Sequence, residues 1–270
     1  IDWSGSGTYD PSGIQALASA LGSSVLKSIN LRDNSLRTEG WCAIFHALRD
    51  NKDNKIESWD VSEQGINVEI AKALAEYVSV SRVLTNLDLS SNQLCGLDWR
   101  GQGTYDPSGI QALASALAGN AVLTSLDLKR NSIGVEGAKA LAASLAVNGV
   151  LTSLNLSNNV IGGYYDDDYD LVSDPSGIQA LASALAGSAV LTNLSIAHNS
   201  SISGQAAQQL AAVQQPIATP LNQFAPVQLP AHTDNPFLSG RQQLLPVGTE
   251  GYHGGLPQNG AMLPPHAAML

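Results

Sequence analysis

A repeated unit constrains the fold of this chain more than any other feature of its 270 residues. The best copy spans residues 106–134 and has two halves. The first half begins with Asp106 and Pro107, an N-cap residue and a proline at the first helical position, where its missing N–H costs nothing. Apolar residues then recur at i, i+3, i+4 and i+7, the spacing of one helical face, at Ile110, Leu113, Ala114 and Leu117.

The second half of the unit predicts a short strand followed by a turn. Its pattern is LxxLxLxxNxI, with apolar residues at Leu123, Leu126, Leu128 and Ile133. The side-chain amide of Asn131 can bond the backbone of neighbouring turns. One strand and one helix cannot bury their apolar faces alone, so the unit needs copies stacked beside it. The sequence therefore predicts an α/β solenoid.

Six copies of the strand pattern can be aligned. They begin at Leu26, Ile56, Leu84, Leu123, Leu151 and Leu191, so that a period of 28 to 30 residues is lengthened twice, to 39 and 40. After each strand we expect a helix, in residues 38–48, 68–78, 108–117, 136–145, 176–185 and 204–213, and one further helix precedes the first strand in residues 12–21.

The segment LTSLDLKRNSIGVEGAKALAASL, residues 123–145, and its relatives resemble the ribonuclease-inhibitor-like subfamily of leucine-rich repeat proteins. The resemblance covers residues 11–213. It implies a curved, horseshoe-shaped solenoid with a parallel sheet on the concave face and helices outside. It implies no single function, because proteins of this kind bind very different partners.

Three insertions interrupt the repeats. Residues 2–13 read DWSGSGTYDPSG, residues 98–109 read DWRGQGTYDPSG, and residues 163–177 keep only the final DPSG. Each lies after a strand turn, or in the equivalent place, and before a helix N-cap. We therefore expect all three to project from the same edge of the solenoid.

The insertions hold five of the seven tyrosines and two of the four tryptophans, beside several aspartates. Tyr and Trp supply much of the energy of protein interfaces, and acidic rims select basic partners. One interpretation is a partner-binding edge formed by Trp3, Tyr9, Trp99, Tyr105, Tyr164, Tyr165 and Tyr169. The other is that the loops only pack on one another as a small core of their own.

The repeat pattern stops after Val213. Residues 214–270 hold nine of the twelve prolines and show no helical period. This composition predicts an extended Pro-rich tail, in which Phe224 and Phe237 are further candidate partner contacts. The predicted organisation is thus a solenoid in residues 1–213 and a non-repeat tail in residues 214–270.

The open face of the predicted sheet is a weaker candidate for partner binding. Its central column contains small polar residues and no aromatic anchor, with Lys129, Arg130 and Arg32 nearby. The column should consist of Asn30, Asp60, Asp88, Asp127, Asn155 and Ser195.

Charge and composition argue against several classes of partner. The net charge is −10 and no basic patch is present, which disfavours nucleic acid and anionic membrane surfaces. No run of about 18 apolar residues could cross a bilayer. Cys42 and Cys95 fall in different repeats, too far apart for a disulfide, which favours a reducing, intracellular compartment. The chain starts at Ile1 without a signal-peptide pattern, so we expect a processed or truncated N-terminus.

Catalysis and metal binding have little support in the sequence. The nucleophile-elbow, phosphate-loop, zinc-protease and paired Cys-x-x-Cys motifs are all absent. The acidic run in residues 166–170 lacks the alternating spacing of an EF-hand calcium loop. His46 and His198 have no partner at catalytic or ligand spacing along the chain. We therefore predict no enzyme activity, no cofactor and no metal.

Two functions remain open from the sequence. The first is a non-enzymatic interaction or scaffold subunit of a multi-protein complex, docking through the inserted loops and the tail. The alternative is a regulator of a nucleotide-dependent protein, such as a GTPase-activating or sensor-type repeat module. No residue matches a GTPase-activating motif, so the alternative is an analogy of fold.

Overall fold

The computed structural model describes residues 10–31, 34, 36–98, 100–165 and 171–199. Its helices are α1 (Ser12–Leu21), α2 (Arg37–Asp50), α3 (Val68–Val80), α4 (Ser108–Gly119), α5 (Val135–Leu145) and α6 (Ser176–Ala186). Its strands are β1 (Ser58–Asp60), β2 (Asn86–Asp88), β3 (Ser125–Asp127), β4 (Ser153–Asn155), β5 (Gly163–Tyr165), β6 (Leu171–Ser173) and β7 (Asn193–Ser195).

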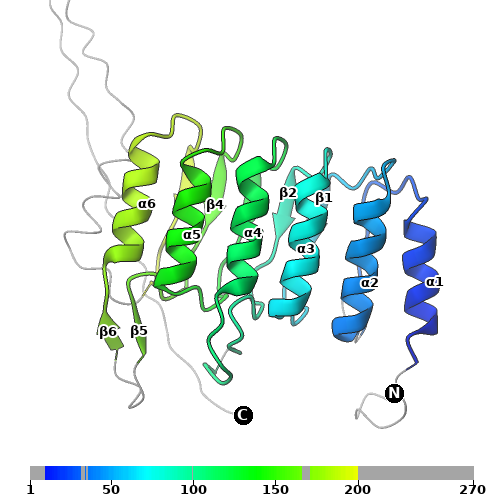
Figure 1. Ribbon diagram of the computed structural model, residues 1–270, viewed down its shortest axis with the longest axis horizontal. Helices are drawn as coiled ribbons and strands as arrows, with labels where there is room; N and C mark the ends of the chain where they lie inside the picture. The colour runs from blue at the N-terminus through cyan, green and yellow to red at the C-terminus, as the bar shows by residue number, and fades with distance from the viewer. Residues whose placement is uncertain (1–9, 32–33, 35, 99, 166–170, 200–270) are drawn as a thin grey trace, which may run out of the picture. The chain divides into compact units, whose positions relative to one another are not determined.

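Five of these strands form one parallel sheet, in the order β1-β2-β3-β4-β7. Its register pairs equivalent residues of successive repeats, in the row Asp60, Asp88, Asp127, Asn155 and Ser195. The helices α1 to α6 stand side by side in one layer against the sheet, each packed on the next (Figure 1). The predicted α/β fold with a parallel sheet and a helix layer is confirmed.

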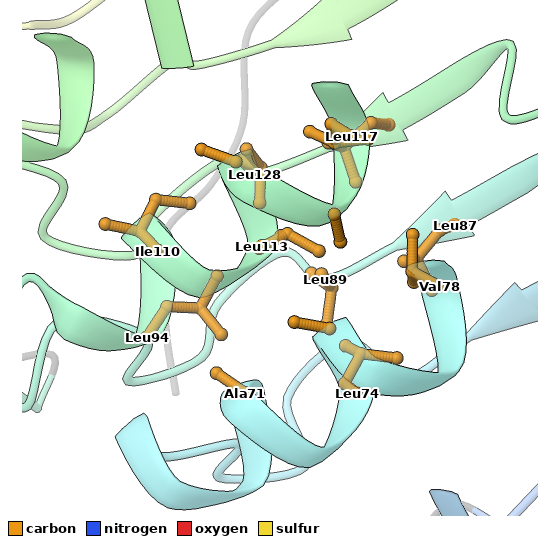
Figure 2. Close-up of a cluster of buried hydrophobic side chains, with 14 of the residues drawn as sticks. Ala71, Leu74, Val78, Leu87, Leu89, Leu94, Ile110, Leu113, Leu117 and Leu128 are labelled. Carbon is orange, nitrogen blue, oxygen red and sulfur yellow. The ribbon is translucent and has the colours of Figure 1, made fainter. Parts of the chain in front are cut away.

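Each strand contributes one side chain to the core between the sheet and the helices. In β1 to β4 the middle residue is buried, while the residues on either side of it in the strand are not. The buried residues are Trp59, Leu87, Leu126 and Leu154. The helices supply the other wall. In Figure 2, Leu74 of α3 and Leu113 of α4 converge on Leu89, the residue after β2. Burial of each such side chain contributes about 1.5–3 kcal/mol to folding.

The core becomes aromatic towards the N-terminal repeats, where Trp59 takes the place of a strand leucine. Its ring centroid lies 6.2 Å from Trp41, 5.3 Å from Phe45 and 6.4 Å from Tyr77. Burial raises the pKa of Tyr77, and its hydroxyl accepts a hydrogen bond from Nδ2 of Asn54 at 2.8 Å. Helices α2 and α3 are therefore joined across β1 by stacked and edge-on rings.

The helices α1, α4 and α6 share the ten residues SGIQALASAL and the same start. Oδ1 of Asp106 accepts the N–H of Ser108 at 2.8 Å. Asp10 and Asp174 accept from the equivalent serines at 2.9 Å. The aspartate therefore satisfies a free N–H of the first turn, as predicted for Asp106.

In α4 and α6, the residue after this serine must be glycine because the backbone of another repeat comes too close for a side chain. A Cβ on Gly109 would lie 2.5 Å from the carbonyl oxygen of Leu94, and one on Gly177 would lie 2.5 Å from that of Ile161. Both oxygens belong to the turn of the preceding repeat. At Gly13 nothing lies within 4 Å of a Cβ. The starts of α4 and α6 therefore rest against the backbone of another repeat.

In four of the turns a buried asparagine, Asn92, Asn131, Asn159 or Asn199, bonds the turn before it. Nδ2 of Asn159 donates to the carbonyls of Leu128 and Leu156, both at 3.0 Å. Its Oδ1 accepts the N–H groups of Asn131 at 2.9 Å and Ile133 at 3.0 Å. One side chain thus satisfies four backbone groups, which is the role predicted for the asparagine of the repeat.

The insertions weaken this ladder of turn asparagines. Asn92, which follows an uninterrupted repeat, bonds its neighbour as fully as Asn159 does. Asn131 follows an insertion, and although its Nδ2 donates to the carbonyl of Leu89 at 2.8 Å, no described residue donates to its Oδ1. Asn199, which follows the third insertion, accepts one N–H at 3.4 Å.

Two further ladders were not predicted. In the connection from a helix to the next strand, Nδ2 of an asparagine donates to a carbonyl near the end of the helix one repeat earlier. The asparagines are Asn51, Asn120 and Asn148, and the bonds are 2.7–2.8 Å long. Just before each strand, a threonine hydroxyl donates to a carbonyl of the preceding repeat at 2.9–3.2 Å, in Thr85, Thr124, Thr152 and Thr192. Side-chain bonds therefore connect neighbouring repeats at both ends of β2, β3, β4 and β7.

The predicted elements agree with the structure except at the N-terminal end. All helices predicted before residue 190 are present, with ends that differ by at most two residues. The strand predicted from Leu26 is wrong, because the described residues 24–31 contain none. Leu26 is 48% exposed, whereas the equivalent Ile56 and Leu84 are fully buried. In the described part of this segment, a backbone bond to the next repeat runs from the N–H of Glu57 to the carbonyl of Lys27, at 3.3 Å.

The remaining expectations are settled in part. Cys42 and Cys95 are both free, as predicted. The helix predicted in residues 204–213, the tail in residues 214–270 and the boundary between them lie outside the described residues, and stay predictions.

We expect the substitution Asn159→Ala to lower the free energy of unfolding more than Asn131→Ala does. The first leaves four buried backbone groups without a partner, at a cost of about 3 kcal/mol or more, and the second should cost about half as much. Urea unfolding of the two full-length variants measures the difference. Equal losses would show that the turn asparagines do not act through these bonds.

Candidate functional site

The described insertions lie on one edge of the repeats, here called the insertion edge, where strand turns lead into helix starts. One insertion lies in the connection between β2 and α4, residues 89–107, and the other in the connection between β4 and α6, residues 156–175. Figure 1 shows the β5–β6 pair and the loop before α4 projecting from the same side of the helix layer. The first insertion lies mostly outside the described residues, so its place at this edge stays a prediction.

The loop before α4 is a small hairpin organised by one aspartate. Oδ1 of Asp98 accepts the N–H groups of Arg100 and Gln102, both at 2.8 Å. Leu97 and Gly103 pair as an antiparallel bridge. The loop therefore satisfies its own backbone and holds a defined position at the edge.

Tyr105, at the end of this hairpin, contacts the next repeat. A Cβ on Gly134 would lie 2.8 Å from its hydroxyl and 3.1 Å from the adjoining ring carbon. Gly134 is the N-cap of α5 and supplies no side-chain cap. The tyrosine hydroxyl occupies that place, within hydrogen-bonding reach of the backbone of Gly134 and Gly137. Tyr105 is 39% exposed, so one side of its ring remains open to solvent.

The environment of Tyr105 disfavours its ionised form. Burial is the largest cause, followed by the thiol of Cys95, and together they raise the pKa of Tyr105 to about 12. Hydrogen bonds from the backbone of Gly134 and Gly137 act in the opposite direction. The phenol therefore stays protonated at neutral pH, and this side chain serves the packing of its own chain.

The third insertion forms the antiparallel pair β5–β6, in which Tyr164 pairs with Val172 and Tyr165 with Leu171. Tyr164 is 53% exposed, one of the most exposed large apolar side chains among the described residues. For Tyr165 the structure describes the backbone, as part of β5. Of the predicted site residues, Tyr164 is the one placed openly at the edge. Trp3, Tyr9, Trp99, Tyr169, Phe224 and Phe237 lie outside the described residues and stay predictions.

The insertion edge is acidic. Hydrogen bonds from the side chain and then the backbone N–H of Ser108 lower the pKa of Asp106, and Ser176 acts in the same way on Asp174. Both carboxylates therefore remain charged well below neutral pH. Asp98 of the hairpin adds a third carboxylate to this edge, which favours basic ligands. Lys72 and Lys139 lie near enough to Asp106 and Asp174 to help lower the pKa of these carboxyls.

An open pocket of about 460 Å³ lies at this edge, between the start of α3 and the hairpin before α4. Its lining is mostly small and polar: Asn67, Val68, Glu69, Gln93, Gly96, Thr104 and Asp106. Two of its lining residues, Glu69 and Asp106, carry carboxylates that can accept a basic side chain of a partner. The sequence offered no signal for it, because its walls come from two different repeats.

The open face of the sheet uses its polar groups internally. Oδ1 of Asp88 accepts the N–H of Ser90 at 2.8 Å, and Asp127 does the same with Lys129. Nδ2 of Asn155 donates to the second carboxylate oxygen of Asp127 at 2.9 Å. These aspartates therefore shape the turns after the strands, in agreement with the lower rank given to this face.

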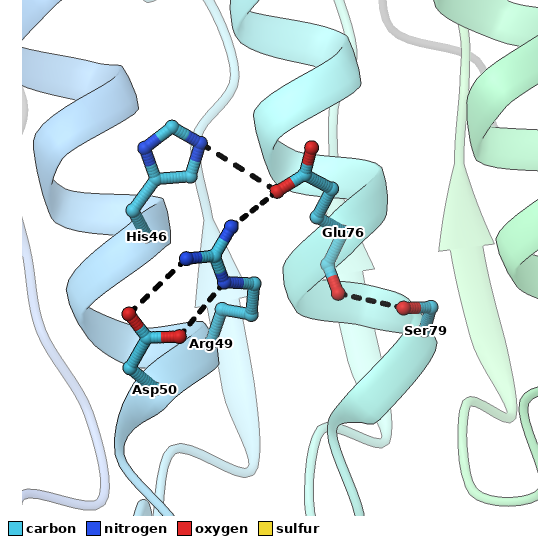
Figure 3. A network of polar contacts seen from close by, with 5 residues as sticks. All are labelled: His46, Arg49, Asp50, Glu76 and Ser79. Atoms are coloured by element: carbon cyan, nitrogen blue, oxygen red, sulfur yellow. Dashed lines mark hydrogen bonds and ion pairs between the residues drawn. The ribbon is translucent and has the colours of Figure 1, made fainter.

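A polar network lies on the outer side of the helix layer (Figure 3). Nε2 of His46 lies 3.7 Å from the carboxylate of Glu76, which also pairs with Arg49. Arg49 donates to both oxygens of Asp50, at 2.8 and 3.1 Å. The sequence placed no carboxylate beside His46, because Glu76 belongs to the next repeat. These exposed pairs connect α2 to α3 at the surface and contribute little to stability.

The described residues offer neither a metal cluster nor a membrane span. No three or more His, Cys, Asp or Glu side chains gather there in a way that could hold a metal ion. None of the helices in this part of the chain has the length and apolar character needed to cross a bilayer.

Comparison with known proteins identifies the repeats. The family model described as Leucine Rich repeat matches residues 119–142 and 147–163. The ladders of side-chain hydrogen bonds described above connect these matched residues to the neighbouring repeats on both sides. No curated protein matches the chain.

Two solved structures have a similar arrangement of elements. "Leiomodin-1 Actin-Binding Site 2 (ABS2)" is 18% identical, with a TM-score of 0.49, and the match covers 63% of this chain and 84% of that one. The tropomodulin C-terminal domain of Caenorhabditis elegans is 14% identical, with a TM-score of 0.41 and coverage of 76% and 92%.

We expect Tyr105→Phe to remove a pH dependence of stability between about pH 10 and 12. The pKa of Tyr105 rises from about 10 in the unfolded chain to about 12 in the folded one. The folded state thus holds the proton more tightly. Its contribution, about 1 kcal/mol after allowance for screening on the exposed side, is complete below pH 10 and is lost as the pH rises to 12.

Urea unfolding at pH 9, 10 and 11 measures this effect in the full-length protein. The Phe variant should lose less stability over this range than the parent. Identical slopes in the two proteins would contradict the packing described for Tyr105.

Proposed function

We propose that this chain, which contains leucine-rich repeats, is a non-enzymatic protein–protein interaction module and a subunit of a larger assembly. Its docking surface is the insertion edge, and its partner presents a basic surface. The exposure of Tyr164 carries this proposal, because a large aromatic side chain stands open on a hairpin that the repeat itself does not require.

The two described insertions differ in a way that supports a division of roles. Tyr105 packs on the next helix and fixes the edge, whereas Tyr164 keeps more than half of its surface in solvent. Aromatic side chains held on rigid elements are the usual anchors of interfaces. Asp98 and Asp106 of one insertion and Asp174 of the other add carboxylates to the same edge, which favours Lys or Arg on the partner.

The finer features of the fold belong to the same proposal. Helices of ten or more residues alternate with the strands β1 to β4 of the sheet, at a base spacing of 28 residues, which supports a horseshoe-shaped solenoid of the ribonuclease-inhibitor-like kind. Trp3, Tyr9, Trp99, Tyr165 and Tyr169 extend the docking edge, and Phe224 and Phe237 of a Pro-rich tail contact a second part of the assembly. The free thiols of Cys42 and Cys95 support an intracellular location.

The alternative, a regulator of a nucleotide-dependent protein, gains no support from the described residues. No contact among them favours it over a binding module. Stimulated GTP hydrolysis by a co-purifying GTPase would be needed to revive it.

The proposal predicts that a photo-crosslinking amino acid in place of Tyr164 captures a discrete basic partner protein in cells. The same group in place of Val147 is the control. Val147 is 68% exposed and lies between α5 and β4, at the opposite edge. Capture should weaken as salt is raised, because the edge acts through charge. Equal capture from both positions, or none from position 164, would overturn the docking edge.

The captured partner allows a quantitative prediction. Tyr164→Ala should weaken its affinity about tenfold, the loss of roughly 1.4 kcal/mol expected for an interface anchor. Thermal stability should change little, because the side chain is half exposed. Val147→Ala should leave the affinity unchanged. An unaltered affinity for Tyr164→Ala would favour the interpretation in which the insertions only pack on one another.

A further inference from the structure

The junction between α4 and α5 is looser than the junctions on either side of it. At the start of α4, a Cβ on Gly109 would lie 3.2 Å from Cα of Val68 in α3. At the start of α6, a Cβ on Gly177 would lie at the same distance from a Cα atom of α5. At the equivalent Gly137 of α5, the nearest atom of α4 is Cγ2 of Ile110, at 2.9 Å. Helix α5 therefore rests on a side chain of α4, whereas α4 and α6 rest on the backbone of the helix before them.

The turns at this junction also share fewer hydrogen bonds. Oδ1 of Asn159 accepts two N–H groups of the turn before it, at 2.9 and 3.0 Å. Asn131 occupies the same place one repeat earlier and is fully buried, but no described residue donates to its Oδ1. The turn that Asn131 faces is the one that leads into the insertion before α4. The insertion edge of this junction has therefore lost bonds that the next junction keeps.

The rest of the junction is bonded as in the other repeats. Strands β2 and β3 pair in register, and the hydroxyl of Thr124 donates to the carbonyl of Thr85 at 3.1 Å. At the opposite edge, Nδ2 of Asn148 donates to the carbonyl of Leu117, at the end of α4, at 2.7 Å. The junction is thus held at the sheet and at the opposite edge, and is weak at the insertion edge.

Tyr105 crosses the junction at this weak edge. Its hydroxyl lies 2.8 Å from the Cβ position of Gly134, the N-cap of α5, and the backbone of Gly134 and Gly137 bonds to it. Helix α3 follows a connection without an insertion and caps itself, because Oδ1 of Asn67 accepts the N–H of Ile70 at 3.0 Å. The start of α5 instead depends on a side chain from the insertion of the repeat before it.

The buried thiol of Cys95 lies beside this contact. Cys95 is 0% exposed, and the backbone of Gly134 bonds to its thiol. Its carbonyl accepts the N–H of Asp106, the residue after Tyr105, at 2.9 Å. The thiol is also close enough to help raise the pKa of Tyr105. Movement of Tyr105 away from Gly134 would therefore open a path from solvent to the thiol.

We propose that Tyr105 is a latch across the junction between α4 and α5. While its ring lies on Gly134, the starts of the two helices are held together. When the ring leaves, they separate at the insertion edge, and the sheet and the Asn148 bond act as the hinge. The exposed side of the ring is where another molecule can reach the latch. The device is distinct from the docking role proposed for Tyr164, which belongs to the other insertion.

The alkylation rate of Cys95 by iodoacetamide measures the opening in the folded, full-length protein, because a buried thiol reacts only when it is uncovered. Tyr105→Ala should accelerate the reaction about tenfold, the effect expected for the loss of about one hydrogen bond. Tyr164→Ala is the matched control and should leave the rate unchanged. Peptide masses follow Cys42 in the same sample, and its rate should stay constant unless the whole protein unfolds.

A second substitution tests the contact itself. A methyl group on Gly134 would meet the hydroxyl of Tyr105, so Gly134→Ala should also accelerate the alkylation of Cys95. Once Tyr105 is alanine, that methyl group has no hydroxyl to displace. The double variant should therefore react no faster than Tyr105→Ala alone. Two effects that multiply would show that these positions do not act through one contact, and the latch would be refuted.

Hydrogen exchange tests whether the opening is confined to one edge. In Tyr105→Ala we expect exchange about tenfold faster in residues 131–138, at the insertion edge, and unchanged exchange in residues 146–152, at the opposite edge. Equal acceleration at both edges would mean that the repeat unfolds as a whole. Faster alkylation with unchanged exchange would mean that the ring only covers the thiol. Either result would overturn the proposal.

Discussion

Buried backbone groups between repeats need hydrogen-bond partners, and in this protein side chains supply many of them. The strands of the sheet are three residues long, so the backbone ladder alone covers little of each repeat. Asn159 bonds the turn after the strand, Asn148 the connection before it, and Thr152 its start. Because each side chain reaches only the neighbouring repeat, the helix layer, the core and the insertion edge all depend on contacts between nearest neighbours.

Most of the fold follows from the sequence because the repeat states it several times. The leucine spacing predicted the strands of the sheet, and Asp106 predicted where α4 begins. The strand expected at Leu26 is absent from the described residues. The leucine pattern shows which side chains a strand could bury, but it does not show whether neighbouring strands are there to pair with it. The ladder of Asn120 and Asn148 was missed because their donor bonds join residues 42 and 31 positions apart, and the leucine pattern does not describe the helix ends that they connect.

The candidate site could be predicted only in outline. Position in the repeat was enough to place the described insertions at one edge. Whether a tyrosine there packs inwards or stands open depends on the path of the loop, and the sequence does not state that path. Tyr105 reaches Gly134 because the Asp98 hairpin turns it towards α5, while Tyr164 lies on a β pair that points into solvent. The insertions also have a structural cost, since the turn asparagines that follow them lose bonds.

The aromatic cluster around Trp59 has a practical consequence for how this protein is observed. Trp41 and Trp59 are buried together near the N-terminal end, and the chain contains no tryptophan after residue 99. Intrinsic fluorescence therefore reports on the first repeats, whereas circular dichroism averages over all helices. In a protein held together by nearest-neighbour contacts, the two signals need not change at the same temperature. A difference between them would measure how far unfolding at one end is coupled to the other.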